Sequence, residues 1–239
     1  AVFELVGGNA VIATQTTGAD GVARFENLQP GVYTIREKSA PEGYLVSVPG
    51  EQSVTVTAGG TAHASFANAE ITGKIRVVKR DSLTREALAG AEFTVTRLSA
   101  PAGATGVGGS VVIVTDASGV AETGWLPWGR YRIEETKVPQ HFVDVGFETE
   151  VEIRDSGRTC EIEVENEPTK GYIRITKTDR LNGNPIEGVR FDIYENDEYG
   201  SALVGSMVTD ENGVAVSEPL RKGRYIVREQ GKTAGYVFE

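Results

Sequence analysis

The chain has 239 residues, with 29 glycines, 9 prolines and a single cysteine, and its formal net charge is −10. Such an acidic chain lacks the basic surface that nucleic acids require, and one cysteine cannot form an internal disulfide bond. No apolar run is long enough to span a membrane, and no signal-peptide pattern begins at Ala1. Abundant Gly, Val and Thr without helical runs predict an all-β protein.

Short segments with alternating polar and apolar residues follow one another along the chain, separated by glycine-containing turns. Alternation of this kind predicts half-buried β-strands. In chain order we expect strands at residues 1–6, 31–37, 52–57, 62–68, 74–81, 90–98, 129–135, 147–153, 160–166, 172–179, 188–194 and 223–229.

One motif occurs three times. It reads GVYTIREKSAPEGY at residues 31–44, GRYRIEETKVPQHF at 129–142 and GRYIVREQGKTAGY at 223–236. Because strand side chains alternate between two faces, the Tyr, the Ile or Val and the Glu of each copy share one face. The sequence therefore places a glutamate on the apolar face three times, as Glu37, Glu135 and Glu229.

Fixed distances separate the other landmark residues. The glutamate follows a glycine by 16 residues in every copy, from Gly21 to Glu37, Gly119 to Glu135 and Gly213 to Glu229. An asparagine follows the glutamate by 31 residues at Asn68 and Asn166, and a lysine follows that asparagine by 11 residues at Lys79 and Lys177. Constant spacing is the signature of tandem repeats, with length changes confined to surface loops.

We interpret the chain as three repeats, at residues 1–70, 71–168 and 169–239, with a period of 98 residues between Glu37 and Glu135. Only the middle repeat contains every landmark. The first lacks its first strand, and the third lacks its last strands. The sequence is best explained as a piece of a longer tandem array.

The same alternation directs a lysine and an asparagine toward the core. Lys79 shares a face with Ile75 and Val77, and Asn166 shares one with Ile162 and Val164. The middle repeat thus sends Lys79, Glu135 and Asn166 inward. The first repeat keeps Glu37 and Asn68, and the third keeps Lys177 and Glu229, so each lacks one member of the set.

Burial of a Lys and a Glu in an apolar core favours their uncharged forms, because it lowers the pKa of the lysine and raises that of the glutamate. A neutral amine is a nucleophile, and a neutral carboxylic acid can polarise an amide carbonyl. We therefore expect Lys79 to attack the side-chain carbonyl carbon of Asn166 with the help of Glu135, releasing ammonia and leaving an isopeptide bond. The alternative is a noncovalent buried ion pair hydrogen-bonded to the asparagine.

The landmarks resemble those of the Cna B-type (prealbumin-like, SpaA-type) repeat domains of Gram-positive surface adhesins and pilins. The resemblance rests on the segments VVKRD and ITKTD, GAEF and GVRF, the glycine before each glutamate strand, and the asparagine that ends the closing strand. It implies tandem Ig-like, prealbumin-like Greek-key β-sandwiches with an autocatalytic Lys–Asn isopeptide bond. Two departures lie in the loop after the glutamate: Gln140-His141-Phe142 follows Pro139 where the pattern continues x-Gly-Tyr, and Thr233 replaces the proline. We therefore expect the shape of this loop to differ.

The resemblance implies a structural stalk or spacer of a cell-wall-anchored adhesin or pilin on the surface of a Gram-positive bacterium. Its partners are then the adjacent repeats of the same polypeptide. The alternative is an adhesin module that contacts host matrix protein through loops, above all residues 101–109. Outward glutamates at 148, 150, 152, 161, 163 and 165 favour the spacer, because a binding module needs an exposed apolar patch. We expect no cofactor, no metal site and no enzymatic action on an external substrate.

Overall fold

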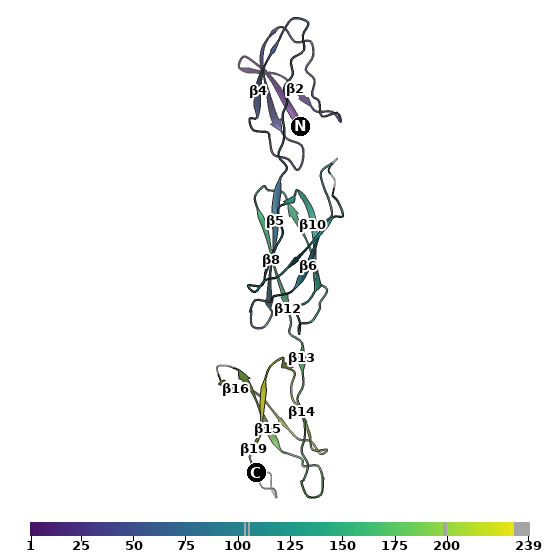
Figure 1. Cartoon of the computed structure of the whole chain (residues 1–239), viewed down its shortest axis with the longest axis vertical. Helices are drawn as coiled ribbons and strands as arrows, with labels where there is room; N and C mark the ends of the chain where they lie inside the picture. The colour runs from purple at the N-terminus through teal and green to yellow at the C-terminus, as the bar shows by residue number, and fades with distance from the viewer. Residues whose placement is uncertain (103, 105, 198–199, 232–239) are drawn as a thin grey trace. The chain divides into compact units, whose positions relative to one another are not determined.

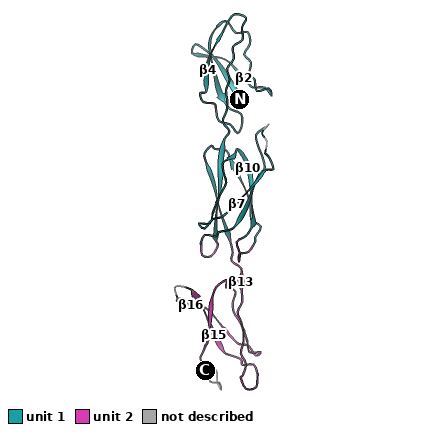
Figure 2. Cartoon of the chain, in the orientation of Figure 1, with its two compact units in different colours: residues 1–80, 86–138, 144–165 teal, residues 81–85, 139–143, 166–239 magenta. Residues whose placement is uncertain are grey.

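The computed structural model describes residues 1–102, 104, 106–197 and 200–231, and in these ranges every regular element is a β-strand (Figure 1). The all-β prediction is confirmed. Among the described residues, no helix is long and apolar enough to cross a bilayer. The chain divides into two compact units, one of residues 1–80, 86–138 and 144–165, the other of residues 81–85, 139–143 and 166–239 (Figure 2).

The N-terminal repeat forms one antiparallel sheet in the order β2-β1-β3-β4. Its strands are β1 (Val2–Gly7), β2 (Ala10–Thr16), β3 (Gly31–Ser39) and β4 (Glu51–Val56). Phe3 and Leu5 of β1 are buried, and the Phe3 ring lies 4.9 Å from that of Phe66. Apolar residues of β1 thus cover one face of this sheet.

The strand expected at residues 62–68 is wrong, because this segment forms no ladder. Its counterpart in the middle repeat, β12 (Thr159–Asn166), pairs with β5 (Thr72–Asp81). The first repeat has no counterpart of β5 within residues 1–70. An extended segment without a neighbouring strand cannot form the hydrogen bonds that define a sheet.

The middle repeat is a sandwich of two sheets. One has the order β11-β10-β6-β7 and the other the order β12-β5-β8, with β9 also paired to β5. The strands not yet given are β6 (Glu92–Arg97), β7 (Ser110–Val114), β8 (Val120–Glu122), β9 (Leu126–Pro127), β10 (Gly129–Lys137) and β11 (Glu148–Ile153). Inward residues of both sheets form one core, including Ile75, Val77, Phe93, Val95, Ile133 and Val164. Two facing apolar sheets are the defining arrangement of a β-sandwich.

The first and last strands of this sandwich, β5 and β12, are parallel. The backbone N–H of Lys74 donates to Arg158 O at 2.9 Å, and that of Ser82 donates to Asn166 O at 3.0 Å. Between these two hydrogen bonds the chain advances from Lys74 to Ser82 along β5 and from Arg158 to Asn166 along β12, so residue numbers increase by the same amount and in the same direction on both strands. The pairing is therefore in register over the whole length of β5.

The C-terminal repeat repeats part of this plan. Its strands are β13 (Lys170–Gly171), β14 (Arg174–Thr176), β15 (Arg190–Asp197), β16 (Gly200–Val208), β17 (Val214–Val216), β18 (Leu220–Arg221) and β19 (Tyr225–Gln230). They form a sheet in the order β16-β15-β19 and two short pairs, β14 with β17 and β13 with β18. A second core gathers around Phe191 and Ile193 of β15. The motif residues from 232 to 236, including Thr233, lie outside the described residues.

The loop after each motif glutamate has the same conformation in the first two repeats. Gly43 has a φ of 82°, and His141, 98 positions later, has a φ of 75°. Both loops hydrogen-bond to the segment that leaves the repeat, through Ile71 N–H to Gly43 O and through Thr169 N–H to His141 O, each at 2.8 Å. The sequence departure at Gln140-His141-Phe142 therefore does not change the loop, although His141 adopts a backbone region that favours glycine.

Candidate functional site

The site begins with Lys79 and Glu135, which lie on facing sheets of the middle sandwich. Alternation along β5 directs Lys79 inward after Ile75 and Val77, and alternation along β10 directs Glu135 inward after Ile133. The Lys79 Nζ donates to Glu135 Oε2 at 2.9 Å, and both side chains are 0% exposed. Two ionisable groups thus meet in the apolar core, as the alternation predicts.

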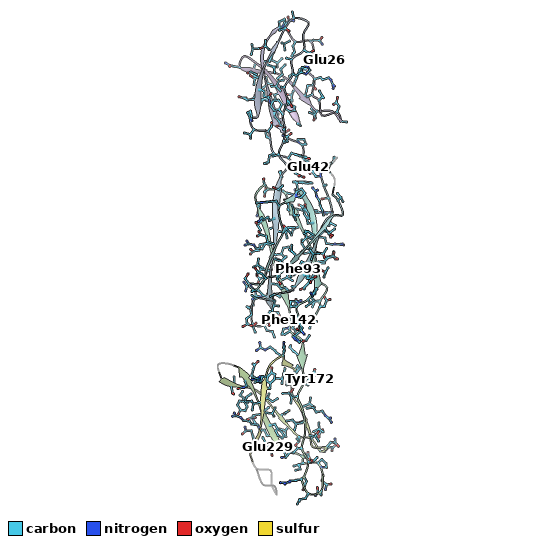
Figure 3. All side chains as sticks on the ribbon, in the orientation of Figure 1. Glu26, Glu42, Phe93, Phe142, Tyr172 and Glu229 are labelled. Carbon is cyan, nitrogen blue, oxygen red and sulfur yellow. The ribbon has the colours of Figure 1, made fainter. Side chains whose placement is uncertain are left out.

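Aromatic rings line this pair. Phe93 on β6 is paired in register with Glu135, and the Lys79 Nζ lies 5.6 Å from the centre of the Phe93 ring. Phe147 meets Phe93 edge to face at 6.4 Å, and Phe93 itself, labelled in Figure 3, is completely buried. The rings keep water away from the amine and the carboxyl, which strengthens every electrostatic interaction between them.

Burial lowers the pKa of Lys79 below its ordinary value of 10.5, although the hydrogen bond and the negative charge of Glu135 act in the opposite direction. Removing an ammonium group from water disfavours its charged form. The environment therefore increases the fraction of Lys79 that is a neutral amine, the form in which it can act as a nucleophile.

Asn166 is the last residue of β12, the strand that lies beside β5 in the sheet. It is 1% exposed and follows the core residue Val164 by two positions, so its inward direction is confirmed. Its Nδ2 donates to the backbone carbonyl of Val143 at 3.2 Å. A buried side-chain amide is thus held by its nitrogen at the end of the closing strand.

The first repeat shows how the glutamate and the asparagine of such a set meet. The Asn68 Nδ2 lies 2.8 Å from Glu37 Oε1 and 3.0 Å from Glu37 Oε2, and it also donates to Leu45 O at 2.9 Å. Leu45 follows Glu37 by eight residues, as Val143 follows Glu135. The backbone carbonyl that accepts a hydrogen bond from the asparagine nitrogen therefore belongs to equivalent residues in the two repeats.

Glu37 is 4% exposed and is held by the loop that follows it. Ser47 donates to Glu37 Oε2 through its backbone N–H at 2.7 Å and through its hydroxyl at 2.5 Å. Burial alone would raise the pKa of Glu37, but the hydrogen bonds from Ser47 and Asn68 outweigh it and hold the pKa below the ordinary value of 4.5. This repeat has no counterpart of Lys79 within residues 1–70, and hydrogen-bond donors stabilise the carboxylate instead.

The third repeat shows the lysine and the glutamate without a counterpart of Asn166. Lys177 Nζ donates to Glu229 Oε2 at 2.8 Å, and Phe191 pairs in register with Glu229 on β19 (Figure 3 labels Glu229). These side chains are 32% and 25% exposed, in contrast to the buried pair of the middle repeat. The geometry of the pair is preserved while its enclosure is not.

The glycine landmark has a function in the site that the spacing alone did not reveal. Lys79 N–H donates to Gly119 O at 2.7 Å, and a Cβ on Gly119 would lie 2.5 Å from the Lys79 carbonyl oxygen. Gly213 meets Lys177 in the same way, with a φ of 69° against 74° for Gly119. Only glycine fits this position, because the backbone approaches closely and φ is positive. It fixes the strand that carries the lysine.

Two features of the site have no signal in the sequence. The carbonyl groups of Leu45 and Val143 are backbone atoms, so their residue types say nothing about their hydrogen bonds to Asn68 and Asn166. Ser47 has no counterpart of the same type at the equivalent position, which is Val145. Only the spacing of eight residues after the glutamate could have pointed to the carbonyl group.

Within the described residues, no three His, Cys, Asp or Glu side chains gather as ligands for a metal ion. The polar groups of this site are a lysine, a glutamate and an asparagine amide, without the cysteine and histidine ligands typical of structural zinc sites.

Comparison with known sequences identifies the family. The profile described as "SpaA: Prealbumin-like fold domain" matches residues 1–70, 73–168 and 171–239. The chain belongs to this family. Among proteins of curated function, none matches the sequence significantly.

Solved structures of this SpaA-type fold resemble the chain to different degrees. The Bacillus anthracis TIE protein is 31% identical over 100% of the chain, with a TM-score of 0.75, and the chain spans 43% of that protein. A streptococcal ancillary pilin is 19% identical over 91% of the chain and 73% of its own, with a TM-score of 0.36. The minor pilin of Streptococcus agalactiae is 18% identical over 75% of the chain and 86% of its own, with a TM-score of 0.35. The family match confirms the prealbumin-like fold expected from the sequence.

Proposed function

We propose that the chain is a stalk segment of a Gram-positive surface protein, made of repeats 1–70, 71–168 and 169–239, and that an isopeptide bond between Lys79 and Asn166 closes its middle repeat. The observation that carries this proposal is the fully buried Lys79–Glu135 pair, 2.9 Å apart, with its lysine in a strand beside the one that ends in Asn166. The three matches to the SpaA-type family support the repeat boundaries.

The reaction would proceed inside the folded repeat. The neutral Lys79 Nζ attacks the Cγ of Asn166, and Glu135 takes a proton from the attacking nitrogen and passes it to Nδ2. The bond between Nζ and Cγ forms, the bond between Cγ and Nδ2 breaks, and ammonia leaves. The lowered pKa of Lys79 supports the nucleophile, and the contact of Asn68 with Glu37 supports the proximity of glutamate and asparagine.

The carbonyl of Val143 would orient the leaving group. Because the Asn166 Nδ2 donates to this oxygen, the amide plane is fixed before attack. Fixed geometry between reacting groups replaces the entropy that a free encounter would cost. The equivalent contact of Asn68 with Leu45 O forms in a repeat without its lysine, so this orientation does not depend on the bond.

A noncovalent ion pair explains the same residues less well. A buried pair of charges is seldom more stable than apolar side chains of similar volume, because both groups lose their hydration. An isopeptide bond removes both the charge of Lys79 and the cost of burying it. We therefore favour the covalent site, which turns over once and acts on no external substrate.

A stalk needs resistance to extension, and the proposed bond supplies it. It would join the strand that opens the repeat to the strand that closes it, so tension would bypass residues 80–165. By the chain-entropy argument used for disulfides, closing so long a loop stabilises the fold by roughly 4–5 kcal/mol. The exposed glutamates of β11 favour this role over the adhesin alternative. Of the loop proposed for that alternative, residues 103 and 105 lie outside the described residues.

The deciding experiment is the intact mass of the denatured protein beside that of Glu135→Ala. The parent should have lost one ammonia and the variant none. Glu134→Ala is the matched control, because Glu134 lies next to Glu135 on the opposite face of β10 and pairs with Arg132; it should react like the parent. A parent of unmodified mass would contradict the isopeptide bond and leave a noncovalent cluster.

A further inference from the structure

The strand β7 is the edge of its sheet and carries no charged residue. Its sequence is SVVIV, and among the described strands it pairs with β6 alone, at the end of the order β11-β10-β6-β7 (Figure 2 labels β7). Val112 and Val114 are 54% and 53% exposed, whereas Ile113 between them is buried. An exposed edge of this composition is a template for pairing with another strand.

The exposed residues Val112 and Val114 of β7 also have backbone N–H and C=O groups that point away from β6. Thr115 N–H donates to Ala91 O at 2.9 Å, and Gly109 O accepts from Arg97 N–H at 3.0 Å, so odd-numbered residues bond to the strand beside them. In an antiparallel ladder the alternate residues direct their N–H and C=O groups to the other side. These residues are Ser110, Val112 and Val114.

The opposite edge of the same sheet has the opposite character. The strand β11 exposes glutamates at 148, 150 and 152. Charged side chains on an edge discourage pairing with other chains. One edge of this sheet is thus protected by charge and the other is not, within a chain of net charge −10.

The counterparts of β7 in the other repeats are uncharged as well. The strand β2 reads AVIATQT and β16 reads GSALVGSMV, and each lies at one end of its sheet. Thr17 N–H and Thr209 N–H bond to Ala1 O and Val189 O as Thr115 N–H does to Ala91 O. The outward positions are again uncharged, as at Thr14 and Ser206. The unprotected edge is a property of the repeat rather than of one strand.

We propose that β7 is a self-association edge, at which two copies of the chain pair antiparallel and join their sheets. The self-complementary register argues for a second copy as the occupant: although the whole chain is acidic, the edge can pair with itself without setting one carboxylate against another. A twofold axis at Val112 sets Val112 against Val112 and Ser110 against Val114, and it places Asp116 opposite Gly108. Such an isologous contact is self-complementary and brings no like charges together.

The contact is small, so we expect weak association, with a dissociation constant between about 1 μM and 1 mM. Sedimentation equilibrium of the whole chain over this range should show dimers. Val112→Pro should weaken the dimer more than about tenfold, because it removes an outward N–H while the bonds to β6 remain. A parent that stays monomeric up to about 1 mM would overturn the proposal.

Matched variants separate pairing from folding. Val112→Lys adds a charge at the same edge without altering the backbone, and it should weaken the dimer in the same way. Glu150→Lys places the same side chain on the opposite edge and should leave the dimer intact. If Val112→Pro and Val112→Lys remain folded by circular dichroism and still dimerise like the parent, β7 is not the contact. Equal weakening by Glu150→Lys would also exclude it.

Discussion

The middle and C-terminal repeats hold the same ion pair in two different environments. Lys79 and Glu135 are 2.9 Å apart and fully buried, whereas Lys177 and Glu229 are 2.8 Å apart and a quarter to a third exposed. The middle repeat has the strand β12 beside the lysine strand, and the described part of residues 169–239 contains no counterpart of it. The strands that carry the lysine and the glutamate therefore set the geometry of the pair, whereas the closing strand sets its dielectric environment.

The strongest test of this difference is Asn166→Ala. It removes the proposed cross-link while Lys79 and Glu135 remain, and it should lower the free energy of unfolding of the middle repeat by roughly 4–5 kcal/mol. For a repeat of this size, the melting temperature should fall by roughly 15–40 °C. Differential scanning calorimetry measures this change, and a melting transition like that of the parent would exclude a stabilising cross-link.

Gly119→Ala tests the glycine that fixes the lysine strand. The new Cβ would lie 2.5 Å from the Lys79 carbonyl oxygen at a φ of 74°, so we expect a loss of about 2–4 kcal/mol in unfolding free energy. Gly21→Ala is the matched control, because Gly21 has a φ of 75° with nothing within 4 Å, and it should lose about 1–2 kcal/mol. Urea denaturation measures both, and equal losses would show that the contact with Lys79 has no effect.

Lys177→Met should have a smaller effect. A partly exposed ion pair contributes about 0–1 kcal/mol, because water screens it in the folded state. Lys79→Met should cost several times more, roughly 4–5 kcal/mol, because it prevents the proposed cross-link and leaves the Glu135 carboxyl buried. Hydrogen exchange of the amides in β5 and β14 measures the two repeats separately. Similar losses in both would contradict the difference in enclosure.

Acid should weaken the first repeat through Glu37. Because the folded state holds the Glu37 pKa below 4.5, its stabilising contribution is complete above that value and is lost as the pH falls through the folded pKa. Glu37→Gln should make the unfolding free energy of this repeat less dependent on pH in that window. Urea denaturation between about pH 7 and pH 3 measures the slope. An unchanged slope would show that another group titrates instead.

Alternation along the strands predicted the inward residues well, because it follows from backbone geometry alone. Lys79, Glu135 and Asn166 are all buried as expected. Alternation did not predict that Lys177 would be partly exposed, because exposure depends on whether a further strand covers the side chain. Strand alternation therefore predicts which face of the sheet a side chain lies on, but not how much of that side chain is exposed to solvent.

The strand predicted at residues 62–68 failed for a related reason. Ala64, Phe66 and Asn68 follow the right alternation, and Phe66 does pack on Phe3, yet the segment has no strand beside it. A strand is a property of two segments, so one segment's pattern is not sufficient. The hydrogen bond from Asn68 to Glu37 forms nevertheless, because it depends on the side chain and not on the ladder.

The parallel pairing of β5 with β12 has a mechanical consequence. The chain enters this pair near Thr72 and leaves it near Asn166, at opposite ends of two strands that run in the same direction. Even without the proposed cross-link, a force on the two ends of the repeat would act along the strands, in shear, and would strain the hydrogen bonds between them at the same time. An antiparallel hairpin pulled from adjacent ends would instead break its hydrogen bonds one after another. The parallel direction of β5 and β12 is thus itself a source of resistance to extension.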